Sequence, residues 1–391
     1  MLKRYRIYFI IGSASLITFT LLGLIAGRVI LNDRAYKNLA ILTEALELVE
    51  KNYVEVVDLG KLYRGALTGL MESLDPECAY LSPEEYRELT QATPEEPGRV
   101  GLEINKKSGF DYARIVRVLP NSPSEKEGLQ PGDWLRAIDH LSTHKLSLWS
   151  IKRKLQGPIG STINLSITKK GKREVVRITL KREKVSPERV SYRVFEGNIG
   201  YLRIPNFLPG VSDTVAQGLQ SLKGNEIASL LIDLRTNILG ELDEVVATAD
   251  MFLDGGEITF LKMSKGNEKS YLAKEGTTLY GEKLFLLVDS DTCNWGEILA
   301  AAIKDNERGE IIGEQTFGRS SLQEIIPLGD GTALRLSVGK FLTPHRTPIE
   351  GKGLTPDLPF TDGKIKNIME RKFVPGDPKL NKALSYIAVS Q

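Results

Sequence analysis

The sequence predicts an α/β core built on a mixed sheet with crossover helices, joined to a β-rich domain, an N-terminal helical arm and one transmembrane helix. Three observations lead to this fold class. The chain has 391 residues, of which 41% are hydrophobic, enough for two or three domains with sizeable cores. Strand-like and helix-like segments alternate through the second half, which is typical of βαβ units. A long run without charge lies near the N-terminus.

The uncharged run extends from Ile7 to Gly27, and as a helix it would span roughly 30 Å, the thickness of a hydrocarbon core. Basic residues precede it. We therefore expect the N-terminus in the cytoplasm and the bulk of the chain outside the cytoplasmic membrane, in the periplasm if the cell has an outer membrane. We predict a single-pass anchor over residues 7–30, held in the cell membrane. A cleaved signal peptide is the alternative.

Residues 35–92 are predicted to form the helical arm, which we expect to pack on the core or on a second subunit. Ser82 and Pro83 mark a helix start, because serine caps free N–H groups and proline fits the first turn. A polar, proline-bearing linker follows at residues 93–99. From Val100 to Lys184 the pattern is β-rich with two short helical pieces.

Composition and charge exclude several classes of function. The net charge of +2 gives no reason to expect a nucleic-acid partner. Cys78 and Cys293 lie far apart and lack metal-site spacing, so they permit one disulfide or none. His140, His144 and His345 are too few to suggest a zinc site, and they leave few candidates for a Ser-His-Asp triad. We expect no metal and no cofactor.

The segment from Leu284 to Gln323 is the centre of the predicted core. It contains a buried strand (LFLLV), turn and cap residues (DSDTCN), a strong helix former (EILAAAI) and a second strand (EIIG). The helix start and the following TFG turn resemble the core of the carboxy-terminal processing (tail-specific) serine proteases. In that family a serine at the helix start is the nucleophile, a lysine in the turn is the general base, and a downstream glutamine orients the lysine.

Laid on this chain, the family pattern fits without a gap and places the nucleophile at Asn294, the base at Arg319 and the glutamine at Gln323. A serine–lysine dyad needs a hydroxyl that can lose its proton and an amine that can be neutral near pH 7. A carboxamide is no such nucleophile, and arginine keeps its charge in proteins. The resemblance therefore implies a degenerate, inactive member, a pseudoprotease.

The oxyanion-binding amides fall, by the same resemblance, at Leu239 and Trp295. The segment SLLIDLRTNILGELDE is similar to the family strand and turn in which a glycine supplies the first amide. We expect Leu239 to change the backbone path, since glycine permits positive φ, and Trp295 to fill the cleft. A misplaced oxyanion hole would add to the loss, because one donor is worth roughly 10²–10³ in rate.

The β-rich domain contains the motif GLQPGDWLRAID, which closely resembles a PDZ domain of the kind inserted in tail-specific proteases. The resemblance implies that the amides of Gly101 and Leu102 receive the terminal carboxylate of a peptide. The peptide would then add as a strand beside Glu103 and Ile104. A PDZ domain that only packs or regulates is the alternative. Both tryptophans of this domain are expected in its core.

The resemblance covers residues 36–391 and divides them into the arm, a PDZ domain at 96–184, a protease-like core at 186–361 and a C-terminal helical segment at 362–391. It implies partners that are unstructured protein C-termini or an active protease relative, with a possible dimer. We therefore predict a non-catalytic, membrane-anchored relative that binds C-termini or regulates an active relative.

Two other functions stay open. The chain is an active serine-type endopeptidase if its nucleophile is displaced to Thr292, Cys293 or Ser320. It is a scaffold subunit if it assembles stably without using the carboxylate loop.

Overall fold

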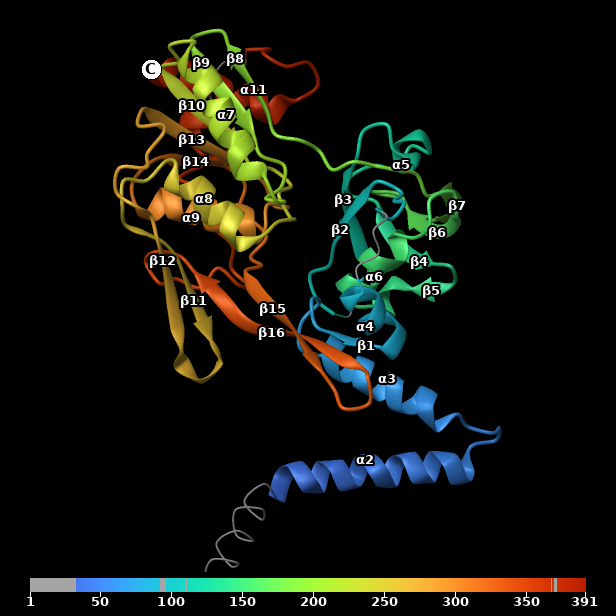
Figure 1. The fold of residues 1–391 in the computed structure, drawn as a ribbon. Helices are drawn as coiled ribbons and strands as arrows, with labels where there is room; N and C mark the ends of the chain where they lie inside the picture. The colour runs from blue at the N-terminus through green and yellow to red at the C-terminus, as the bar shows by residue number, and fades with distance from the viewer. Residues whose placement is uncertain (1–32, 92–95, 110, 367, 369–370) are drawn as a thin grey trace, which may run out of the picture. The chain divides into compact units, whose positions relative to one another are not determined.

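The computed structural model describes residues 33–91, 96–109, 111–366, 368 and 371–391 (Figure 1). The chain divides into two compact units, one ending at Gly69 and the other beginning at Leu70. The first unit contains α2 (Asp33–Asn52) and most of α3 (Leu59–Glu72). Large apolar side chains such as those of Leu39 and Tyr63 are exposed on these helices.

The predicted fold class is corrected in one respect. The transmembrane helix expected at residues 7–30 lies outside the described residues, and within the described ranges no helix is both long and apolar enough to cross a bilayer. The longest helix, α2, has 20 residues and carries charged side chains along its length, among them Glu44 and Glu47. The fold described is therefore an α/β core with a PDZ domain and N-terminal helices, without a membrane-spanning helix.

A six-stranded mixed sheet in the order β17-β14-β13-β10-β9-β8 forms the centre of the core (Figure 1). All its neighbouring strands run parallel except β8, which is antiparallel to β9. The predicted mixed sheet with crossover helices is confirmed. In chain order the strands are β8 (Ser191–Phe195), β9 (Ile199–Arg203), β10 (Ser229–Asp233), β13 (Lys283–Val288), β14 (Glu310–Gly313) and β17 (Leu358–Pro359).

Alternate residues of the central strands point to opposite layers, as the period of two in a strand requires. Leu230 and Leu286 belong to the cluster that includes residues of α7, α8 and α9. Leu231 and Phe285 belong to the cluster on the other face, which includes α11. The helices are α7 (Val211–Lys223), α8 (Leu242–Asp250), α9 (Trp295–Asp305), the short α10 (Gly363–Lys366) and α11 (Pro378–Ser390).

A second sheet has the order β1-β16-β11-β12, with β15 paired to β16 as a long hairpin. Its first strand comes from the arm, where only helices were predicted. The helix start at Ser82 is confirmed, because α4 begins there with a capping box between Ser82 and Glu85. The elements are β1 (Ala79–Leu81), α4 (Pro83–Thr90), β11 (Glu257–Met263), η2 (Ser264–Gly266), β12 (Glu268–Leu272), β15 (Ser321–Pro327) and β16 (Ala333–Leu342).

The PDZ domain is an antiparallel sheet in the order β2-β3-β4-β6-β7, so β2 lies at the sheet edge. Helix α6 packs on the same hydrophobic cluster as β2 through Leu148 and Ile151. The elements are β2 (Leu102–Asn105), β3 (Ala113–Val118), α5 (Pro123–Lys126), β4 (Trp134–Ile138), β5 (Leu141–Ser142), η1 (Thr143–Lys145), α6 (Leu148–Leu155), β6 (Thr162–Thr168) and β7 (Val175–Lys181).

Candidate functional site

The structure brings the predicted nucleophile and base positions together through their backbones. The N–H of Asn294, at the start of α9, donates to the carbonyl of Arg319 over 2.7 Å. On either side, the N–H of Cys293 donates to the carbonyl of Asn237, and the N–H of Phe317 donates to the carbonyl of Thr292. These loops follow β10, β13 and β14, whose carboxyl ends meet at one edge of the parallel sheet. The frame that the family pattern implies is therefore folded here.

Asn294 stands in a strained conformation, with φ of 51° and ψ of −109°. A side chain rarely adopts this region unless the surrounding fold imposes it. The side chain is half-buried, and its carboxamide oxygen is buried without a hydrogen-bond partner in the described structure. A carboxamide offers a donor and an acceptor but no group that attacks a carbonyl.

Glu297 holds this frame in place, although the sequence analysis assigned it no functional role. Its carboxylate is fully buried and accepts the N–H groups of Asn294 at 3.1 Å, Gly318 at 2.7 Å and Arg319 at 3.0 Å, together with the hydroxyl of Thr316. Burial raises the pKa of this carboxyl to about 7, and these hydrogen bonds oppose the shift. Its place on the third helical residue, typical of a capping box, was the available signal.

The guanidinium of Arg319 contacts residues of the PDZ domain and of the N-terminal arm. The side chain is only 5% exposed, and it donates to the carboxamide oxygen of Asn105 and the carbonyl of Lys106. It lies 3.4 Å from Glu77 and 4.7 Å from the centroid of the Phe317 ring. Because Asn105 and Lys106 belong to the PDZ domain, Arg319 joins the PDZ domain to the core.

Glu77 is the counterion of this cluster, and no sequence signal pointed to it. Its buried carboxylate lies within ion-pair distance of Lys152, Arg319 and Arg335. Burial alone would raise the pKa of Glu77, but the three cations hold it at about 2. Glu77 is therefore charged at neutral pH, and it balances the charge that arginine brings to position 319.

Gln323 is retained from the family pattern but does not contact Arg319. Its amide nitrogen donates to Ser321 at 2.9 Å and to Ser337 at 2.8 Å, both hydroxyls of the β15–β16 hairpin. Ser337 in turn donates to Asp75 over 2.6 Å. In this chain the glutamine therefore stabilises the contact between the hairpin and the arm.

The two predicted oxyanion positions, Leu239 and Trp295, lie in different environments. Leu239 is half-buried, and its carbonyl accepts the N–H of Phe207 over 2.8 Å. The following Gly240 is required, because a Cβ there would lie 2.5 Å from that of Phe207. The ring of Trp295 packs against Phe341 with centroids 5.7 Å apart, as part of the main core.

The three candidates for a displaced nucleophile are all buried, and each is unsuited to attack. The hydroxyl of Thr292 donates to the carbonyl of Leu234 at 3.0 Å, and that of Ser320 to the carbonyl of Phe341 at 3.1 Å. Burial raises the pKa of the Cys293 thiol well above its usual range, which disfavours the reactive thiolate. Cys293 and Cys78 are both free and form no disulfide.

The four predicted peptide-binding residues line one pocket of about 100 Å³ between β2 and α6. Gly101 has φ of 81°, and a Cβ on it would lie 2.1 Å from that of Ser122, so only glycine fits. Leu102 and Ile104 add apolar surface. Glu103 is buried beside Arg117 at 3.5 Å, and burial raises its pKa while Arg117 opposes the shift.

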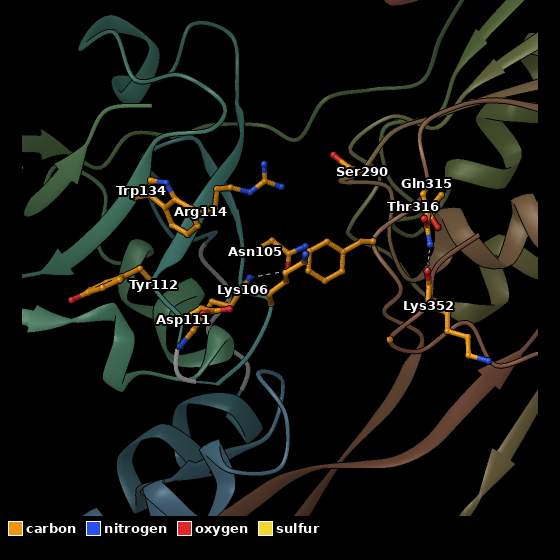
Figure 2. A pocket seen from close by; sticks show the side chains of 13 residues that line it. Asn105, Lys106, Asp111, Tyr112, Arg114, Trp134, Ser290, Gln315, Thr316 and Lys352 are labelled. Atoms are coloured by element: carbon orange, nitrogen blue, oxygen red, sulfur yellow. Dashed lines mark hydrogen bonds between the residues drawn. The ribbon is translucent and has the colours of Figure 1, made fainter. Parts of the chain in front are cut away.

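A larger cleft of about 780 Å³ lies between the PDZ domain and the core, and Asn105, Lys106 and Phe317, which contact Arg319, are among its lining residues. Figure 2 shows Trp134 and Arg114 on the PDZ side and Thr316 and Lys352 on the core side. Trp134 is 37% exposed and lines this cleft, so its prediction as a core residue was wrong. Arg114 pairs with Asp291 of the core.

Among the residues that the structure describes, no group of three or more histidine, cysteine, aspartate or glutamate side chains is placed to hold a metal ion.

Comparisons with known proteins agree with this architecture. The model of peptidase family S41 matches residues 198–360, and a PDZ domain model matches residues 114–169. A carboxy-terminal-processing protease of Bartonella bacilliformis is 32% identical over 331 residues, which cover 83% of this chain and 76% of that protein. A carboxyl-terminal-processing protease of Synechocystis sp. is 31% identical over 297 residues, covering 75% and 69%.

Among solved structures, the photosystem II D1 C-terminal processing protease superposes with a TM-score of 0.67 at 26% identity, covering 81% of this chain and 91% of that one. The fold and the site thus define an α/β peptidase fold that carries a PDZ domain. The chain belongs to peptidase family S41, and the relatives it matches are carboxy-terminal-processing proteases.

Proposed function

We propose that this chain is a non-catalytic member of family S41 that binds polypeptide C-termini through its PDZ groove. One observation carries the non-catalytic part. The nucleophile and base positions are Asn294 and Arg319, and the guanidinium of Arg319 is engaged by Asn105, Lys106 and Glu77.

The chemistry at these positions leaves no route to an acyl-enzyme. Attack on a carbonyl requires a nucleophile and a base that removes its proton. Arginine stays protonated in proteins, and every nitrogen of its guanidinium is a donor without a free lone pair for a proton. The neighbouring Thr292, Cys293 and Ser320 are buried, so the site offers no replacement nucleophile.

The binding part of the proposal rests on the groove itself. Backbone amides receive a carboxylate whatever the side chains are, and β2 is an edge strand to which a peptide can add. Arg99 and Lys152 also line the pocket and bring positive charge to it. A free C-terminus is the ligand that combines an extended backbone with a terminal carboxylate.

The test of the catalytic part is cleavage of an unfolded protein substrate by the full chain, compared with the double variant Asn294→Ser, Arg319→Lys. We expect the natural chain to be silent and the double variant to cleave slowly. The single variant Asn294→Ser is the matched control, and it should stay silent because Arg319 cannot serve as its base.

Cleavage by the natural chain would overturn the proposal. Labelling with a serine- or cysteine-reactive probe, mapped to a residue, would then identify the nucleophile. If all three proteins are silent, the non-catalytic function stands and the surroundings of Leu239 and Trp295 account for the failed rescue. Regulation of an active relative stays a prediction.

A further inference from the structure

The peptide groove and the larger cleft meet along strand β2. Residues 99–104 line the groove, and Asn105, Lys106 and Lys107, which follow directly, line the cleft between the PDZ domain and the core. A polypeptide that binds by its carboxylate at Gly101 must run antiparallel to β2, and it advances about 3.4 Å per residue. Its residues about five to seven positions before the C-terminus therefore reach the cleft.

Strand pairing along β2 stops where the cleft begins, because the backbone and side chains there already have partners. Arg319 donates to the carbonyl of Lys106 and to the side chain of Asn105. The ammonium group of Lys106 donates to three backbone carbonyls of the PDZ domain, at 2.7, 3.0 and 2.7 Å, so its hydrogen bonds are satisfied internally. A bound polypeptide therefore leaves the strand at this point and passes between the two walls of the cleft.

Each wall of the cleft carries a lysine that has no ionic partner. Lys107 on the PDZ side and Lys352 on the core side are exposed, and in the described part of the chain no carboxylate lies within ion-pair distance of either ammonium group. Figure 2 shows Lys352 across the cleft from Arg114, whose own charge is balanced by Asp291. Among the described residues that line the cleft, Asp111 alone is acidic.

Two uncompensated positive charges in one cleft favour an anionic occupant. Charges of one sign that face each other between low-dielectric walls reinforce the local potential, which attracts carboxylates and repels ammonium groups. Trp134, which is 37% exposed, and Phe317 give the same cleft apolar surface against which the rest of the polypeptide can pack. The cleft is therefore complementary to a polypeptide segment with acidic side chains.

We propose that Lys107 and Lys352 are specificity-determining residues that select polypeptides with an acidic segment shortly before the C-terminus. This inference rests on the proposed function, since it assigns the residues that precede a C-terminus bound at Gly101. The ligand then has two parts: a terminal carboxylate held by backbone amides, and side-chain carboxylates held by one lysine from the PDZ domain and one from the core.

The test is a binding titration of the full chain with three fluorescent peptides. They share their last four residues, which end in valine, and differ only in the three residues before these: glutamates, glutamines or lysines. In about 50 mM salt we expect the glutamate peptide to bind about tenfold more tightly than the lysine peptide, because exposed ion pairs form in one and repulsion acts in the other. About 0.5 M salt should remove most of this difference by screening.

Variants of the two lysines assign the effect to the cleft. The double variant Lys107→Gln, Lys352→Gln should bring the ratio of the two affinities close to one, and its binding of the glutamine peptide reports that the groove is folded. The double variant Lys107→Glu, Lys352→Glu should reverse the order of the peptides. Lys223→Gln is the matched control, since Lys223 is an exposed lysine of α7 that lines neither pocket, and it should keep the natural ratio.

The outcomes separate the two proposals. If no peptide binds, or if an amidated glutamate peptide binds as tightly as the free one, the proposed C-terminus binding fails and this inference fails with it. If the three free peptides bind equally well, or if both double variants keep the natural ratio, the selection of acidic segments is wrong while C-terminus binding stands. A ratio that is lost or reversed in the double variants, but kept in Lys223→Gln, supports the inference.

Discussion

The positions predicted for the nucleophile and base and the predicted peptide groove differ in what their chemistry depends on. At Asn294 and Arg319 the loops meet through a backbone hydrogen bond, whereas a reaction there would depend on the two side chains, and neither is a serine or a lysine. At Gly101 and Leu102 the proposed carboxylate binding depends on backbone amides. That groove therefore tolerates many substitutions, provided that its glycine stays.

The difference teaches that a hydrogen-bonded frame and a reaction depend on different groups. The frame at positions 294 and 319 is held by Glu297 and its three N–H partners, whatever the side chains at those two positions can do. The side chain of Arg319 also has a structural part. It contacts the PDZ domain, where it makes charge-assisted hydrogen bonds of the stronger kind.

The largest expected effect comes from breaking the backbone of the groove. Gly101→Ala should lower affinity for a C-terminal peptide at least about a hundredfold, about 3 kcal/mol, because the new Cβ would lie 2.1 Å from that of Ser122. Peptide titration together with a thermal unfolding curve checks this. Gly128→Ala is the matched control: it has positive φ too, but nothing lies within 4 Å of its Cβ. Equal losses in both variants would refute the steric account.

The next effect tests the charge cluster around Arg319. The pKa of Glu77 in the folded state, about 2, is below its ordinary value of 4.5. Between these two pH values the folded state therefore binds fewer protons than the unfolded state. Its contribution is fully present above about pH 5 and is lost as pH falls from 4.5 towards 2. It amounts to roughly 3 kcal/mol of unfolding free energy. Glu77→Gln should remove this part of the pH dependence.

Urea unfolding at pH 7, 4 and 3 measures the effect of Glu77. Glu88→Gln is the control, since Glu88 pairs with Arg153 at the surface and its side chain is 65% exposed. The acid sensitivity of the control should match that of the natural chain. If the unfolding free energy of Glu77→Gln fell between pH 7 and pH 3 as much as that of the natural chain, the cluster would not couple folding to protonation.

The smallest effect concerns the backbone strain at Asn294, the position predicted for the nucleophile. Asn294→Gly should raise the unfolding free energy by about 1 kcal/mol, because glycine adopts φ of 51° and ψ of −109° without strain and removes a buried carboxamide oxygen that lacks a partner. Thermal unfolding measures it, with Asn198→Gly at an exposed positive-φ asparagine as control. A loss of stability would mean that the Asn294 side chain makes a stabilising contact.

Local pattern was enough to predict several elements of the site. The βαβ alternation and the helix start at Ser82 follow from short segments, since caps and hydrophobic periodicity depend on neighbouring residues. The pairing of positions 294 and 319 was predicted through the resemblance to the family. The groove glycine Gly101 was assigned through the resemblance to a PDZ domain, and the structure gives it a positive φ of 81°.

The sequence by itself determined the types of residue at positions 294 and 319, and these types decide whether a proton can be moved there. Only the tertiary structure decided which partners these residues meet. Glu77 and Asn105 contact Arg319 although they lie 242 and 214 residues away in the sequence. Ile238 of the core lines the peptide pocket of the PDZ domain. The exposure of Trp134 was decided in the same way. Such contacts depend on how whole domains pack, and no local periodicity in the sequence specifies which distant residue a buried charge or an aliphatic side chain will contact.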